Sequence, residues 1–227
     1  FTLSGRMLLG LVVFGLACSG TDAVVRGHPQ IQPQQLRLSF LHWVLPAALT
    51  TVAWVLLTRP DSTEVKGIVV TITSGLLALV IAAEYHTVDP TGRWRTAVQF
   101  SLRLVTYLLA MLLYIAIHLG IPADLAAAIT VAMSSVILGF RVLCDDECTL
   151  KRLWPYVLGL GALLGIASWL LNLWIASPLL HSLALVVLLY VLTSMIRQFL
   201  LGRLTPRLAL EYLLAGAVVL WLLLSYV

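Results

Sequence analysis

Residues 67–95 read GIVVTITSGLLALVIAAEYHTVDPTGRWR, a long apolar run followed by a polar turn. The 17 residues of 67–83 carry no charge, and they approach the length of about 20 apolar residues that a helix needs to cross a bilayer. Glu84 closes the run, and a turn that contains proline and glycine follows. Residues 93–95 then bring basic and aromatic side chains, which gather where a membrane meets water. The stretch predicts a membrane-spanning helix that ends in a polar turn at one membrane surface.

The same pattern repeats along the chain, and the composition is that of an integral membrane protein. Of 227 residues, 61% are hydrophobic and 11% are charged, whereas about 25% are charged in an average soluble domain. We therefore predict an all-α fold, a polytopic transmembrane helical bundle with seven spans. The predicted spans cover residues 38–58, 67–83, 98–119, 123–143, 154–176, 179–196 and 208–227.

The first 35 residues form a separate region in the predicted domain plan. Residues 7–18 are an apolar run of 12 residues, which is short for a membrane span. We interpret this run as a signal-peptide core or a short interfacial segment. If it spans the membrane instead, the bundle has eight helices. Residues 27–35 form a polar linker with two prolines, and residues 36–227 form the seven-helix transmembrane domain.

Basic residues are distributed unevenly between the two predicted membrane surfaces. If the linker and the loops after the second, fourth and sixth spans share one side, that side holds twelve of the fourteen Lys and Arg residues. The twelve are Arg6, Arg26, Arg37, Arg93, Arg95, Arg103, Arg141, Lys151, Arg152, Arg197, Arg203 and Arg207. The positive-inside rule then places the linker and basic loops in the cytoplasm and the C-terminus outside the bacterial cytoplasmic (inner) membrane. Basic residues at helix ends suit lipid headgroups, so we expect no nucleic acid as a partner.

Five ionisable residues fall near the predicted cytoplasmic ends of four spans. Ionisable groups inside a membrane usually face the interior of a bundle or a watery cavity. Gathered at one depth, they could bind a quinone headgroup, move a proton, or ligate a metal or the magnesium of a chlorophyll-type pigment. The alternative, which we favour, is that they reach the interface and pair with nearby arginines. The five are His42, Glu84, His86, Arg103 and Glu211.

Three further polar residues, His118, Asn172 and His181, lie near the predicted outer surface. They are candidate ligands on that side, although interfacial histidines are more common than axial pigment ligands. Gly161 and Gly165 are four residues apart in one predicted span. Small residues at this spacing let another helix approach closely, so we assign both to helix packing.

Several functional classes are excluded. A retinal protein needs a lysine in its last span, but Lys66 and Lys151 both lie in predicted loops. Cys144 and Cys148 could supply half of a zinc site, but no second pair completes it. No phosphate-binding loop or haem-attachment motif occurs. We therefore predict no metal site and no catalytic residues.

Three short segments resemble an uncharacterised multi-span membrane protein family of green non-sulfur (filamentous phototrophic) bacteria. They are Glu84-Tyr85 followed by Asp89-Pro90, the segment WLLNLWIASP at 169–178, and the segment LLGRLTPRLALEY at 200–212. The resemblance implies a bacterial membrane rich in quinone-linked and light-harvesting complexes. It implies no catalytic residues.

The sequence thus favours a non-catalytic accessory or scaffolding subunit of a larger bacterial membrane complex, in photosynthetic or respiratory electron transfer. Such a subunit would pack against partner helices, lipid, quinone, carotenoid or a chlorophyll-type pigment. The alternative is a small membrane enzyme or carrier that acts on a lipid or isoprenoid at the cytoplasmic cluster of His, Glu and Arg residues.

Overall fold

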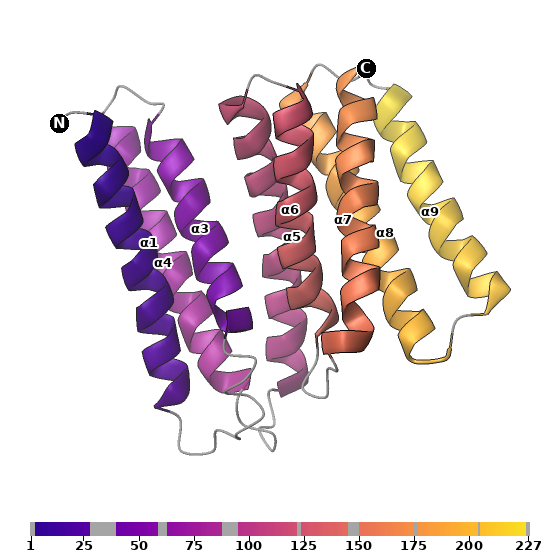
Figure 1. The fold of residues 1–227 in the computed structure, drawn as a ribbon, viewed down its shortest axis with the longest axis horizontal. Helices are drawn as coiled ribbons and strands as arrows, with labels where there is room; N and C mark the ends of the chain where they lie inside the picture. Colours follow the sequence, from indigo (N-terminus) through magenta and orange to yellow (C-terminus); the bar gives the residue numbers. More distant parts are fainter. Residues whose placement is uncertain are drawn as a thin grey trace. The chain divides into compact units, whose positions relative to one another are not determined.

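The computed structural model describes residues 3–27, 40–58, 63–87, 95–121, 124–144, 150–174, 177–203 and 205–225. Within these residues the chain forms eight helices and no strand (Figure 1). The predicted all-α fold class is confirmed. The chain divides into two compact units, unit 1 of residues 1–109 and unit 2 of residues 110–227.

Unit 1 contains α1 (Leu3–Arg26), α3 (Phe40–Thr58), α4 (Thr63–Thr87) and the first part of α5 (Arg95–Gly120). Figure 1 shows α1, α3 and α4 running alongside one another. Leucine and valine side chains from α3, α4 and α5 fill the core between these helices. This cluster consists of Leu45, Leu49, Val80, Leu102 and Leu109.

Unit 2 contains the remainder of α5 with α6 (Asp124–Leu143), α7 (Leu150–Asn172), α8 (Pro178–Leu200) and α9 (Pro206–Ser225). The helices α6 and α7 pack together most closely. Gly161 and Gly165 of α7 lie directly against α6, where a Cβ on Gly161 would be 2.7 Å from the Ala132 carbonyl oxygen. The glycines therefore bring two helices of the same chain together.

Six of the described helices are long and apolar enough to cross a membrane. They are α1 and α4 to α8, whereas α3 contributes a shorter apolar stretch from His42 to Thr58. This result is consistent with a multi-pass membrane protein. The number of crossings, seven or eight, stays a prediction.

Helix α1 is longer than the apolar run at 7–18 because the polar residues after the run are satisfied inside the helix. The Thr21 hydroxyl donates to the Ala17 carbonyl at 2.7 Å, and Asp22 forms an ion pair with Arg26 one turn later at 2.6 Å. These contacts let the helix continue to Arg26, and residues 8–26 then have the length and composition of a membrane span.

Candidate functional site

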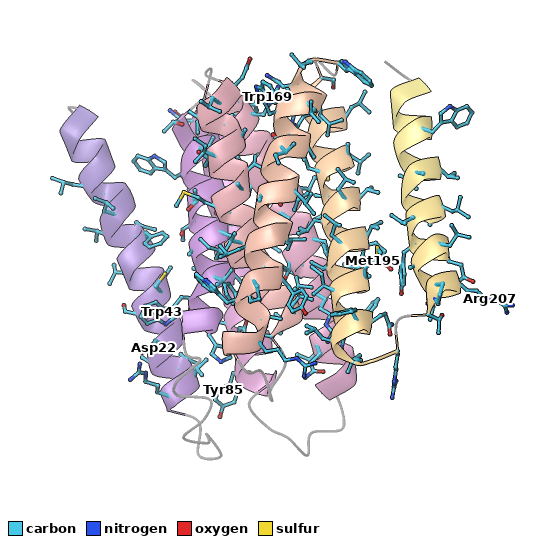
Figure 2. The ribbon with its side chains drawn as sticks, turned by 45° about the vertical axis from the view of Figure 1, so that its right-hand side comes forward. Asp22, Trp43, Tyr85, Trp169, Met195 and Arg207 are labelled. Atoms are coloured by element: carbon cyan, nitrogen blue, oxygen red, sulfur yellow. The ribbon has the colours of Figure 1, made fainter. Side chains whose placement is uncertain are left out.

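Glu84 and His42 form a hydrogen-bonded pair at one end of unit 1. The start of α3 lies beside the end of α4 because the two helices run antiparallel. Nδ1 of His42 is 2.7 Å from Oε2 of Glu84. Figure 2 labels their sequence neighbours, Trp43 and Tyr85, at this same end of the unit. One proton therefore lies between the two side chains, either on the imidazole next to an ionised carboxylate or on the neutral acid.

Among the buried polar residues that the structure describes, Glu84 is the one with a carboxyl group. Glu84 is 0% exposed and the side chain of His42 is 17% exposed. The burial of a carboxyl group away from water has a large free-energy cost unless the group is hydrogen-bonded or paired. Pro46 adds a local irregularity in α3, because a proline has no N–H to bond the carbonyl of His42 one turn earlier. The pair thus combines a buried acid with a helix turn that lacks one backbone hydrogen bond.

The other residues of the predicted cytoplasmic cluster are placed differently. Arg103 lies half-buried on α5 within unit 1. Glu211 is exposed on α9 in unit 2. The side chain of His86 lies outside the described residues. Of the five predicted residues, His42 and Glu84 are in contact in the described structure, and whether the five bind a ligand stays a prediction.

A second polar group lies in unit 2, where α5 and α7 end and α8 begins. The imidazole rings of His118 and His181 are 4.7 Å apart between centroids and tilted by 35°. His181 is 2% exposed. Its Nε2 is 3.2 Å from the Ser168 hydroxyl, while its buried Nδ1 has no hydrogen-bond partner. The two candidate histidines from the sequence therefore do lie together.

Asn172, the third predicted outer residue, binds a residue that sequence reasoning did not select. Its Nδ2 donates to Oδ1 of Asp124, at the start of α6, at 2.6 Å. Ser168 was also missed, yet a signal was available, because residues four apart on a helix share a face. Ser168 lies four residues before Asn172, so both project from the same side of α7.

A family model described as "Protein of unknown function (DUF5656)" matches residues 1–227. The chain belongs to the DUF5656 family. No curated protein and no solved structure matches the chain. The resemblance predicted an uncharacterised family, and the family match agrees with it. That the family belongs to green non-sulfur bacteria stays a prediction.

In the described part of this DUF5656 chain, the candidate residues form hydrogen bonds with one another. Among the residues that the structure describes, no group of three or more His, Cys, Asp or Glu could hold a metal ion. Cys144 is buried and forms no disulfide among the described residues, and Cys148 lies outside the described residues. The His42–Glu84 pair shares one hydrogen bond, and the His118–His181 pair stacks two imidazole rings beside the Ser168 hydroxyl.

Proposed function

We propose that the protein is a non-catalytic accessory or scaffolding subunit of a larger bacterial membrane complex. The observation that carries this proposal is an uncovered apolar face on α4. In the apolar stretch of α4 from Lys66 to Tyr85, 11% of the residues are buried. A helix that is apolar yet so exposed has its surface available to lipid or to other helices.

Small residues occupy the middle of this face. At 100° per residue they fall within a sector of about 100° around the helix axis. All of them are exposed, and they are Gly67, Thr71, Ser74, Gly75, Ala78 and Ala82. We call this set the α4 small-residue face. Larger apolar side chains flank it, including Ile68 and Leu79, which are 58% and 62% exposed.

The α4 small-residue face has the composition of a helix-packing surface. Lipid chains are as apolar as leucine, so helices in a membrane associate through close van der Waals packing, which small residues permit. A Cβ at Gly67 or Gly75 would meet no atom within 4 Å. In the described structure these glycines are thus not used for packing within the chain, unlike Gly161 and Gly165. The proposed occupant is a transmembrane helix of another subunit.

The setting of the proposed complex comes from the family resemblance. It points to a cytoplasmic membrane with photosynthetic or respiratory electron transfer, where quinone, carotenoid or chlorophyll-type pigment could lie between subunits. The basic loops, on the cytoplasmic side in this proposal, would contact anionic headgroups.

Purification from the native membrane in a mild detergent tests this proposal. Mass spectrometry should find stoichiometric membrane subunits, and an absorption spectrum of the same peak would reveal any pigment. Gly75→Leu should reduce co-purification, because it fills the α4 small-residue face. Gly159→Leu is the matched control, since Gly159 is an exposed glycine on α7 whose Cβ would also meet no atom within 4 Å. A colourless protein without partners would refute the proposal.

A second candidate is a small enzyme or carrier for a lipid or isoprenoid. The buried His42–Glu84 pair favours it, because ionisable residues inside a membrane usually face the bundle interior or a watery cavity and mark functional sites. This function requires a cavity that reaches the pair. Glu84→Gln preserves the shape of the side chain but removes the acid, so it should abolish the action of the protein on its lipid or isoprenoid. The measurement is the lipid and isoprenoid composition of membranes that contain the original or the substituted protein. A scaffold would tolerate the same substitution and retain its partners.

A further inference from the structure

A cavity of about 290 Å³ lies between α1, α3 and α4, entirely within unit 1. Its walls are mainly apolar, and they include Leu9, Val13, Leu49, Ala53 and Leu77. Neither His42 nor Glu84 lines it. The cavity therefore lies away from the buried pair and is a separate feature of unit 1.

The threonine hydroxyls in the cavity wall are already satisfied. Thr50 donates to the Pro46 carbonyl at 2.9 Å, and Thr73 donates to the Val69 carbonyl at 2.7 Å. A buried water needs two to four polar partners. Ser74 and Trp54 also line the cavity, but most of its wall consists of apolar side chains, so water finds few hydrogen-bond partners there and an apolar occupant is favoured.

Trp54 of α3 packs against α1 in the wall of the cavity. A Cβ at Gly10 would lie 3.0 Å from the Trp54 indole ring, so the ring packs tightly on the α1 backbone. The missing side chain of Gly10 makes this approach possible. The indole thus lies between α1 and α3. Gly10 and Trp54 both line the cavity.

The cavity is lined by segments of candidate membrane spans, where hydrocarbon would be the surrounding solvent. Its wall on α4 extends from Val70 to Leu77, a distance of about 10 Å at 1.5 Å per residue. Those residues lie inside the candidate span from Lys66 to Tyr85, and the α1 wall lies inside the candidate span from Leu8 to Arg26. A volume of about 290 Å³ is close to the lower end of the range for ligand pockets, about 300–1,000 Å³.

We propose that this cavity binds an acyl chain of a bilayer glycerolipid. An empty cavity forfeits dispersion contacts along its walls, and water lacks polar partners there. Acyl chains are the main component of a bilayer's hydrocarbon region, and a volume of about 290 Å³ suits part of a single chain rather than a bulky ligand. This inference goes beyond the proposed function, because a lipid chain could bind in the absence of any partner subunit.

The full-length protein in phosphatidylcholine vesicles provides the test. A small fraction of the lipid carries a photoactivatable diazirine in mid-chain, and cross-linked peptides are mapped by mass spectrometry. Labelling of Leu9, Val13, Leu49 and Ala53 should be several-fold stronger than labelling of Leu163 and Ile166, which are 53% and 57% exposed on α7. Equal labelling of both groups would overturn the proposal. No partner is present, so the result does not depend on the proposed function.

Variants that fill the cavity make the test specific. Ala53→Phe should reduce labelling of the cavity wall several-fold and leave the α7 labelling unchanged. Ala162→Phe is the matched control, because Ala162 is exposed on α7. Val13→Phe fills the cavity from α1, so it serves if Ala53→Phe fails to give a monodisperse protein. Unchanged cavity labelling in a folded filling variant would refute the site.

A competition arm identifies the source of the chain. Adding an isoprenoid quinone to the vesicles should leave the cavity labelling unchanged if acyl chains are the preferred occupants. Loss of labelling at a low molar ratio of quinone to lipid would overturn the acyl-chain assignment in favour of an isoprenoid chain.

Discussion

Glu84 is a fully buried acid, and its hydrogen bond to His42 should contribute measurably to stability. We predict that a double-mutant cycle of His42→Ala and Glu84→Ala gives a coupling free energy of about 1.5–3 kcal/mol, the range for hydrogen bonds to charged groups. Each single substitution leaves the other polar group with one partner fewer. The measurement is the free energy of unfolding of all four proteins in the same detergent. Additivity within about 0.5 kcal/mol would contradict the prediction.

A second hydrogen bond, between Tyr114 and Ser135, should respond unequally to removal of its two partners. Their hydroxyl oxygens are 2.8 Å apart, and Ser135 also donates to the Val131 carbonyl at 2.6 Å. Tyr114→Phe leaves Ser135 with that acceptor, so we expect a loss near 0.6 kcal/mol, roughly the average in membrane helices. Ser135→Ala leaves the buried Tyr114 hydroxyl without this partner, and about 1–3 kcal/mol should be lost.

Comparison of the two single variants by thermal unfolding decides this point. Tyr114→Phe should always be the milder change, because its phenyl ring still fills the same space in unit 2. Equal losses, or a larger loss for Tyr114→Phe, would contradict the predicted asymmetry.

At the level of single residues, the sequence predicted that polar residues gather at helix ends, but it did not predict which of them are partners. Position along a helix places His42 and Glu84 near one membrane surface, and their types indicate a polar contact. The pairing itself joins residues 42 positions apart, and it depends on how α3 and α4 pack. The same reason explains why Ser168 and Asp124 were missed as partners of His181 and Asn172.

At the scale of helices, the contact between α6 and α7 makes a sharp prediction about glycine. Gly161→Ala should destabilise the protein by about 1–3 kcal/mol, the usual range for overpacking. The added Cβ would lie 2.7 Å from the Ala132 carbonyl oxygen, and a backbone atom cannot move aside without shifting a helix. Unfolding in detergent, followed by circular dichroism, measures the effect.

Gly159→Ala is the matched control on the same helix. A Cβ at Gly159 meets no atom within 4 Å, so this variant should be neutral or stabilised by up to about 1 kcal/mol through helix propensity. Similar effects for both alanine variants would show that close packing of α6 on α7 does not depend on Gly161.

The positions of the helices were predictable because a helix that spans a membrane needs a long apolar run. Some helix ends were not predictable. The predicted span at 154–176 corresponds to α7 at Leu150–Asn172. Residues after Asn172 are still apolar, yet Leu173 and Trp174 turn back to carbonyls three residues earlier. Pro178 disfavours a helical conformation at Ser177, which is extended at φ −79° and ψ 119°. Hydropathy alone does not register these backbone effects. The cavity was not predicted either, because it depends on Gly10 facing Trp54 across two helices.

For the whole molecule, the uneven distribution of Lys and Arg predicts one orientation, with the C-terminus outside. The test places single cysteines in a background where the three native cysteines are alanine. Gly120→Cys sits at the end of α5, where a Cβ meets no atom within 4 Å, and Arg203→Cys sits on the exposed segment after α8. A membrane-impermeant maleimide should label Gly120→Cys in intact cells. It should label Arg203→Cys only after the cells are permeabilised, because that segment belongs to the basic, cytoplasmic side. The reverse pattern would show that twelve basic residues on one side do not orient this chain.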